Sequence, residues 1–378
     1  MNKMKKLIFL FILAFSFIVI LPTGFFSFAQ TDEELPTPDS YVEKVIEEMP
    51  EDVKTHLPDG STYEELAQNA DSDYLLSLSL AFLRQSLNSI YTYLSYFVVA
   101  LLLGSLAKRI EDAFGKPDME IASYVVLLVI AFEAFFILHS LFEEVSEFCK
   151  KISSYMLGVT ATMGSVSLLG GGTMISAKGV STVSITVTLL GTLCSTLLLP
   201  IIRLSFASSF SSIASQKINL SSFSSFFRNI FTFLIGFVSI VSIVVITFQT
   251  MLAQAEDSLA ARSIRFAASS SIPIVGNAVG DSVRTLGAAV AVIQKSVGTI
   301  GAVGIVIMTL YPLSILFSAK IAFSLSKAIA GLLDIHNAEG LLSQSCHLIN
   351  MLLATVAILS ILYIFITALY TGTTIPIA

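Results

Sequence analysis

A single carboxylate stands in the middle of a long apolar stretch of the chain. Glu133 is surrounded by the run Ala131-Phe132-Glu133-Ala134-Phe135-Phe136. Ionisable side chains are costly inside a membrane and are functional candidates by default. Two interpretations remain open: Glu133 lines a polar pathway and can take up a proton, or it locks two helices together through a hydrogen bond. His139 follows six positions later, so it lies on a different face of an ideal helix.

A second group of charges surrounds a glycine-containing turn in the second half of the chain. Its members are Arg262, Arg265, Asp281, Arg284 and Lys295, placed around Pro273 and the segment from Gly276 to Gly280. Such a group suits the mouth of a pore for an anionic or polar solute. The alternative is that these side chains anchor at lipid headgroups or pair with Glu256 and Asp257. The candidate residues for a pathway or a gate are Glu133, Gly170, Gly171, Gly172, Pro273, Gly276, Gly280, Asp281 and Arg284.

Motifs for catalysis and for metal binding are missing from the sequence. It contains no GxxxxGK[ST], HExxH or GxSxG motif, and its four histidines are scattered. The three cysteines (Cys149, Cys194 and Cys346) are far apart in sequence and have no CxxC spacing. We therefore expect no enzyme activity, no catalytic residue, no cofactor and no metal site. If a complex containing this chain consumes nucleotide, another subunit must supply the ATPase.

The composition indicates the environment that positions these residues. Of 378 residues, 54% are hydrophobic and 13% are charged, and the mean hydropathy is +0.83. A soluble domain has about 25% charged residues, so this chain lacks the polar surface that a soluble protein of its size needs. The sequence predicts an all-α polytopic membrane protein. No basic cluster is present that would contact nucleic acid.

The first 88 residues form two segments that precede the membrane region. Residues 1–29 read as a secretory signal peptide: three lysines precede an apolar run, and Ser27-Phe28-Ala29 resembles a cleavage site. Residues 30–88 form an acidic extracytoplasmic arm, with fourteen acidic residues against three basic ones. Prolines restrict this arm to short helices, one before Pro50 and one after Ser61. The arm is either a solvated segment or a docking surface for a basic partner.

Six stretches are long and apolar enough to cross a membrane: residues 89–107, 121–141, 180–204, 230–252, 297–317 and 348–369. Two further segments, residues 152–178 and 266–293, are rich in Gly, Ala, Ser and Thr, and we predict that they are re-entrant or broken helices. The predicted divisions of the membrane region are a first hairpin (89–147), repeat unit one (148–258) and repeat unit two (259–378).

The two repeat units share a pattern. In each, a glycine-rich segment precedes a span that ends in Leu198-Leu199-Pro200 or in Leu310-Tyr311-Pro312. Six spans with an extracytoplasmic N-terminus place eight basic residues on the cytoplasmic side. An eight-span topology satisfies the positive-inside rule about as well. We favour six spans, because only Lys295 and Ser296 would separate two spans in the alternative.

The order of segments resembles the stage III sporulation protein AE family of endospore-forming bacteria. The resemblance covers most of the chain and is closest at Arg262-Ser263-Ile264-Arg265-Phe266, Ile272-Pro273-Ile274-Val275-Gly276 and Lys295-Ser296-Val297-Gly298-Thr299-Ile300-Gly301. It implies a place in the outer forespore membrane, within a channel or secretion-like complex that joins mother cell and forespore. The implied partners are the other stage III sporulation A proteins, including a cytoplasmic ATPase, and indirectly the forespore protein Q. A homo-oligomer is compatible with this arrangement.

Two functional hypotheses follow from the resemblance. In the first, the chain forms or gates the export conduit, and the glycine-rich segments line a polar path that Glu133 or Arg284 faces. In the second, the chain is a non-conducting membrane scaffold that assembles the complex.

Overall fold

The computed structural model describes residues 38–58, 60, 65–66, 69–70, 72–114, 120–169, 172–214, 221–271 and 276–372. The predicted signal peptide and the helix start at Ser61 lie outside these residues. All regular elements among them are helices: α2 (Pro38–Glu47), α3 (Glu51–Lys54), α5 (Ser72–Phe114), α6 (Glu120–Leu169), η2 (Ile175–Gly179), α7 (Val180–Leu193), η3 (Cys194–Leu198), α8 (Leu199–Ala214), α9 (Ser221–Ser271), α10 (Gly276–Leu332) and α11 (His336–Gly372). The elements η2 and η3 are π-helical turns.

Six helices are long and apolar enough to cross a membrane, and each coincides with one of the six predicted spans. They run through residues 73–110, 124–169, 175–211, 223–259, 290–332 and 336–371. A helix suits these sequences because it satisfies every backbone polar group internally where no water is available. The prediction of an all-α polytopic membrane protein is therefore confirmed, and the chain is a multi-pass membrane protein.

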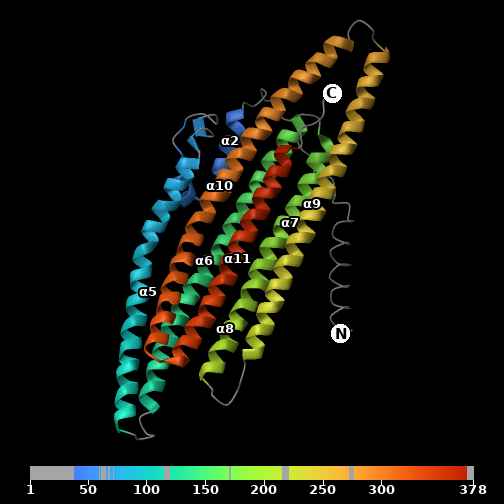
Figure 1. Cartoon of the computed structure of the whole chain (residues 1–378). Helices are drawn as coiled ribbons and strands as arrows, with labels where there is room; N and C mark the ends of the chain where they lie inside the picture. The colour runs from blue at the N-terminus through green and yellow to red at the C-terminus, as the bar shows by residue number, and fades with distance from the viewer. Residues whose placement is uncertain are drawn as a thin grey trace, which may run out of the picture.

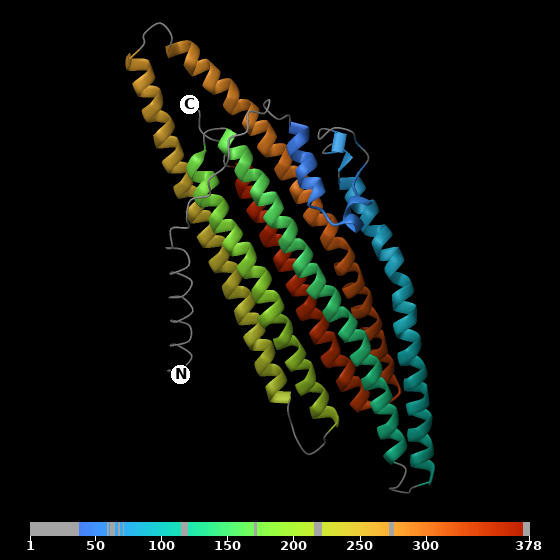
Figure 2. The ribbon, with the colours of Figure 1, turned by 180° about the vertical axis from the view of Figure 1, so that it is seen from behind.

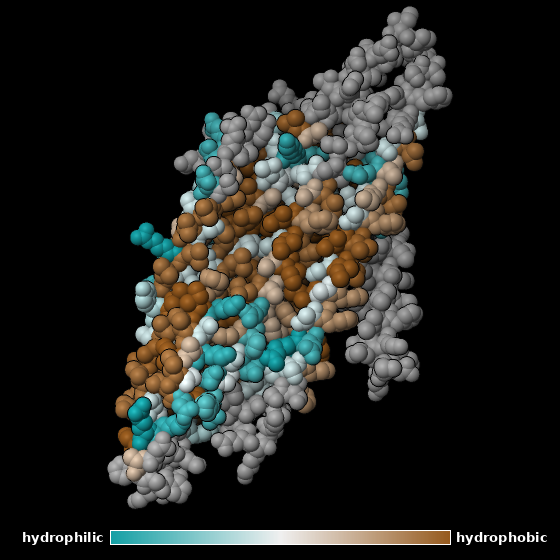
Figure 3. Space-filling view, in the orientation of Figure 1, coloured by the Kyte–Doolittle hydropathy of each residue, from teal (hydrophilic) through white to brown (hydrophobic). Residues whose placement is uncertain are grey.

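Charged side chains flank the apolar part of each helix, on both sides in five helices and on the N-terminal side alone in α11. No Asp, Glu, Lys or Arg occurs between Arg84 and Lys108, between Lys178 and Arg203, between Arg228 and Glu256, between Lys295 and Lys320, or after Glu339. The space-filling view shows the result as a hydrophobic band over the middle of the bundle, with hydrophilic residues gathered along its lower edge (Figure 3). In α6 the corresponding stretch from Ile121 to Phe142 contains one charge, Glu133.

The helices form an elongated bundle in which α5 and α9 lie at opposite edges (Figure 1). Seen from behind, α6 and α11 again lie between them (Figure 2). The segment from η2 through α7 and η3 to α8 is one continuous rod that crosses the bundle once. The C-terminal ends of α5, α8 and α10 lie at one end of the bundle, and α2 and the C-terminal end of α11 lie at the other (Figure 1).

Small residues on α10 allow other elements to approach its backbone closely. A methyl group added at Gly304 would lie 2.6 Å from Cε of Met49, and one at Gly301 would lie 3.2 Å from Cγ1 of Val159. Close approach of this kind replaces the hydrophobic effect as the source of helix association in lipid. These contacts identify Gly301 and Gly304 as packing residues.

The beginning of the acidic arm packs on the bundle. In α2, the side chains of Tyr41, Val42 and Val45 are buried, and α2 contacts α10 and α6. The short helix expected before Pro50 is present, and a second short helix, α3, follows directly after it. The described beginning of the arm is therefore a cap on one end of the bundle rather than a segment surrounded by water.

Both glycine-rich segments coincide with helix ends. Residues 152–169 continue α6, and the chain then turns into η2; residues 276–293 begin α10. Re-entry of either segment into the membrane, and the two-unit repeat, stay predictions.

Candidate functional site

Glu133 lies on α6 at the border between its buried and its exposed face. Its neighbour Ala134 is fully buried, whereas Phe132 and Phe136 are more than half exposed. The Glu133 side chain is half-buried, and no hydrogen bond or ion pair reaches it from the residues that the structure describes. His139 is engaged elsewhere: its Nε2 lies 3.4 Å from the Glu143 carboxylate, and its ring stacks on Phe135. The Glu133 carboxylate therefore stays available to a partner from outside the chain.

Apolar side chains fill the centre of the bundle, where a pathway through a single chain would run. Tyr155, Tyr363 and Phe323 are among the largest fully buried side chains. A cavity between α7, η3, α9 and α11 measures only about 30 Å³, and its walls include Leu190, Leu234 and Leu359. Buried hydroxyl groups pair with one another, as Thr309 and Ser360 do at 2.7 Å. The described centre of the bundle is therefore packed with side chains.

The first glycine-rich turn is held by a carboxylate from another helix. The buried Asp257 of α9 accepts hydrogen bonds from the backbone N–H groups of Met174 (2.9 Å) and Ile175 (2.8 Å). These N–H groups belong to the first turn of a helix and have no partner within it, so a carboxylate there neutralises both the donors and the helix dipole. Beside it, Lys178 pairs with Glu256 at 2.6 Å. Asp257 thus fixes the chain directly after Gly172.

Glu133 lies far along α6 from the first glycine-rich segment. Glu133 and the end of α6 at Leu169 are about 50 Å apart along the helix axis, at 1.5 Å per residue. The predicted path residues Gly170, Gly171 and Pro273 lie outside the described residues. Gly276, Gly280, Asp281 and Arg284 belong to α10, in a part whose side chains are not described. The structure therefore separates Glu133 from the glycine turn by more than the thickness of a bilayer core.

A polar cavity of about 370 Å³ opens where the arm meets α5, α6 and α10. Its polar lining comes from α3 and the residues after it (Asp52, His56), from α5 (Gln85) and from α6 (Glu144, Glu147, Lys151). Lys151 binds Asp52 at 3.1 Å and Glu147 at 2.9 Å, and so ties the arm to the bundle. Sequence reasoning missed this cavity, because its residues are spread over four segments.

Polar contacts at the opposite end of the bundle join helices that are distant in sequence. Arg228 of α9 donates to Gln344 of α11 at 2.9 Å, and Lys327 of α10 donates to Ser343 at 3.0 Å. Lys108 at the end of α5 donates to the Asp334 carboxylate at 2.7 Å. This hydrogen bond, together with the charges of Lys108 and His336, lowers the pKa of Asp334 below its ordinary value.

One known protein family matches the membrane region of the chain. The stage III sporulation protein AE family matches residues 63–374, which include all six apolar helices. The chain belongs to the stage III sporulation protein AE family. No curated protein and no solved structure matches the chain significantly. Membership in this family confirms the resemblance seen in the sequence and assigns the chain a role in stage III sporulation.

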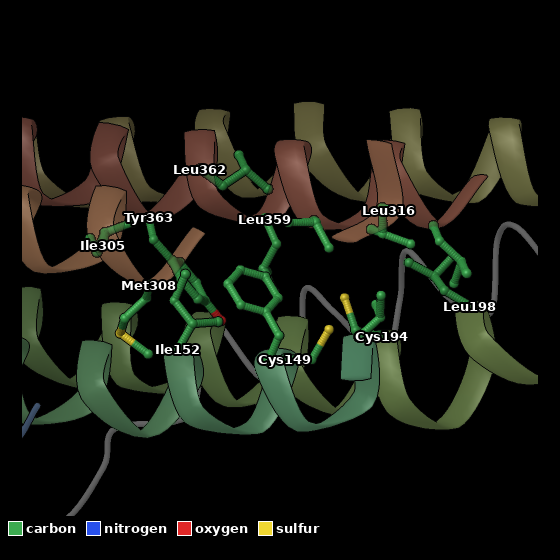
Figure 4. Close-up of a cluster of buried hydrophobic side chains, with 14 of the residues drawn as sticks. Cys149, Ile152, Cys194, Leu198, Ile305, Met308, Leu316, Leu359, Leu362 and Tyr363 are labelled. Atoms are coloured by element: carbon green, nitrogen blue, oxygen red, sulfur yellow. The ribbon is translucent and has the colours of Figure 1, made fainter. Parts of the chain in front are cut away.

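Two cysteines of this family member meet in the core, although they are far apart in sequence. Cys149 of α6 and Cys194 at the start of η3 are both buried, and their side chains point toward one another (Figure 4). Tyr363 lies close by and its hydroxyl is 2.9 Å from that of Ser153. No spacing rule could have found this pair, since two helices bring it together. Both thiols are free.

No metal site emerges from the described residues of this family member. Among them, no group of three or more His, Cys, Asp or Glu side chains is arranged to hold a metal ion.

Proposed function

We propose that the chain is a membrane subunit of the sporulation complex that links mother cell and forespore, and that it contributes to the wall or the gate of the export conduit. Its place is the outer forespore membrane. Its partners are the other stage III sporulation A proteins, including a cytoplasmic ATPase, with the forespore protein Q reached indirectly across the intermembrane space. Membership in the stage III sporulation protein AE family and the six apolar helices support this proposal.

The observation that best supports the conduit role is the environment of Glu133. It is the one charge within the apolar stretch of α6, and the corresponding stretches of the other five helices contain none. It is half-buried at the border of an exposed face, while the centre of the bundle is packed. A carboxylate in such a place is stable when water or a polar partner reaches it. A polar path therefore runs between this chain and its neighbours, and these neighbours include further copies of the same chain.

The test compares two carboxylates of one helix. Glu133→Gln removes the charge and keeps the shape, and Glu143→Gln does the same at an exposed residue outside the apolar stretch. We expect Glu133→Gln to lower late forespore gene expression and heat-resistant spore counts, with normal complex assembly by co-purification. Glu143→Gln should behave like the wild type. Normal sporulation in Glu133→Gln and in Glu133→Ala would contradict the conduit role.

A scaffold role is the second candidate. The packed centre and the arm that caps the bundle favour it, because both suit a rigid body that holds partners in place. Under this hypothesis, Glu133→Gln either has no effect or reduces co-purification of the partners together with sporulation. Loss of spores with an intact complex would therefore exclude the scaffold as the whole function.

A further inference from the structure

We infer that the cavity between the arm and α5, α6 and α10 binds a small organic cation, with a primary ammonium group on a short apolar stem. The cavity measures about 370 Å³, within the range of pockets that hold small ligands. It lies at the end of the bundle that the arm covers, which is the extracytoplasmic end if the N-terminus is exported.

The cavity is lined by three carboxylates and one lysine. The carboxylates are those of Asp52, Glu144 and Glu147, and the lysine is Lys151. The ammonium group of Lys151 forms ion pairs with both Asp52 and Glu147. Within the described residues, no hydrogen bond or ion pair reaches the carboxylate of Glu144, which is half-buried. A half-buried carboxylate in a cavity is stabilised by a bound cation.

We assign a second acceptor to the backbone of α10, where a proline interrupts the hydrogen bonds of the helix. Pro312 lies inside this helix and lines the cavity together with Met308. Because proline has no N–H group, the carbonyl of Met308 lacks the hydrogen bond that residue 312 would donate in a regular helix. A ligand that carries several N–H donors, as an ammonium group does, matches a carboxylate and a carbonyl acceptor in one pocket.

Aromatic rings form one wall of the cavity. The rings of His56 and Phe82 meet edge to face with centroids 4.9 Å apart, and those of Phe82 and Tyr311 do so at 6.0 Å. Aromatic faces attract organic cations and also accept an apolar stem. The combination of a carboxylate, a carbonyl and an aromatic wall favours an organic ammonium ion. A metal ion such as Ca²⁺ or Mg²⁺ requires oxygen ligands on all sides. The ammonium group belongs either to a free amine or to a lysine side chain of a partner polypeptide.

The binding test uses ligands that differ only in charge. The full-length chain in detergent is titrated calorimetrically with n-pentylammonium, 1-pentanol and pentanoate at about pH 8, where histidine is neutral. We expect saturable binding of n-pentylammonium and none of the other two. Capped lysine amide is the fourth ligand: tighter binding of it than of n-pentylammonium assigns the site to a partner's lysine, and the reverse assigns it to a free amine. Binding of neither cation, or equal binding of 1-pentanol, would overturn the inference.

Variants place the cation in the cavity. Glu144→Gln should weaken n-pentylammonium binding by about tenfold, since a charged hydrogen bond is lost. Glu143→Gln, the adjacent carboxylate outside the cavity, should leave binding unchanged. Gln85→Arg brings a guanidinium group into the cavity from an exposed position on α5, and should abolish binding while keeping the chain folded. Unchanged binding in both Glu144→Gln and Gln85→Arg, each with a normal unfolding temperature, would refute the site.

Discussion

The two long helices α9 and α10 have similar hydropathy but opposite surroundings. In the most apolar window of α10, 61% of the residues are buried, against 17% in that of α9. Their composition differs in the same direction: α10 carries Gly298, Gly301 and Gly304 where it meets other elements, while α9 presents large side chains such as Ile240, Val244 and Phe248 outward. Hydropathy alone therefore does not tell an inner helix from an outer one, because lipid is as apolar as the core.

The two helices are also held by different forces. Over its described part, α10 is held mainly by packing, as at the contact of Phe323 with Phe97, with polar contacts such as that of Thr309 with Ser360 added to it. Polar contacts near its two ends hold α9: Asp257 caps η2 at one end, and Ser224 joins Ser209 at 2.7 Å near the other. Between these ends much of α9 faces outward. We expect substitutions to be severe along α10 and severe on α9 only near its anchoring residues.

The largest difference is expected for two phenylalanines. Phe323 of α10 is fully buried, and Phe248 of α9 is 60% exposed. Phe323→Ala leaves a cavity against Phe97 and should lower the free energy of unfolding by about 3 kcal/mol. Phe248→Ala should change it by less than about 0.5 kcal/mol. Thermal unfolding in detergent, followed by circular dichroism, measures both; equal losses would show that α9 is packed as tightly as α10.

Removal of the Asp257 carboxylate comes next. Asp257→Ala leaves the N–H groups of Met174 and Ile175 without acceptors, and we expect a loss of about 2–3 kcal/mol. The adjacent Glu256→Ala breaks only an exposed ion pair with Lys178 and should cost less than about 1 kcal/mol. The same unfolding assay compares them. If the two variants lost equal stability, the anchoring role of Asp257 would be wrong.

A smaller effect is expected when a methyl group is added to each helix. Gly304→Ala brings the new group against Tyr155 and Met49, and overpacking of this kind costs about 1–3 kcal/mol. Gly236→Ala on α9 meets nothing within 4 Å and should be neutral or slightly stabilising, because alanine favours the helix. Unfolding midpoints of the two variants test the difference directly, and a tolerated Gly304→Ala would contradict the close packing of α10.

The smallest effect concerns pH and the turn between α10 and α11. Lys108 lowers the pKa of Asp334, so this pair stabilises the fold at pH values above the ordinary carboxyl pKa, and the stabilisation is lost as the pH falls through the lowered value. Asp334 has a positive φ of 59°, which asparagine tolerates well. We expect Asp334→Asn to unfold at a slightly lower temperature than the wild type at neutral pH and at the same temperature near pH 2. A difference that persists in acid would contradict this account.

Sequence reasoning predicted the number and the position of the membrane helices, because length and hydropathy determine whether a segment can cross. It did not predict which faces of the helices meet. The cap by Asp257, the ion pair of Lys151 with Asp52 and the meeting of Cys149 with Cys194 all depend on the rotation of helices about their axes. In lipid, no difference between wet and dry surfaces encodes that rotation in the sequence.

The extent of the arm could not be predicted either. Its acidic composition indicates a solvated segment, yet apolar residues such as Tyr41, Val42 and Val45 of α2 are buried against the bundle. Short helices of this kind give a weak signal next to six apolar spans, since a few buried side chains change the average composition very little.

The π-helical turn η3 changes which residues of α8 face the core. A π turn holds one residue more than an α turn, so the residues after it are rotated by about 100° from the phase that α7 sets. Val183, Val187 and Leu190 are buried in α7, and after η3 the buried positions are displaced by one, to Leu199, Ile202 and Phe206. The segment from Cys194 to Leu198 thus behaves as a one-residue insertion that the fold absorbs on the spot. A shorter relative that lacks one residue here would keep the same lipid-facing and core-facing surfaces.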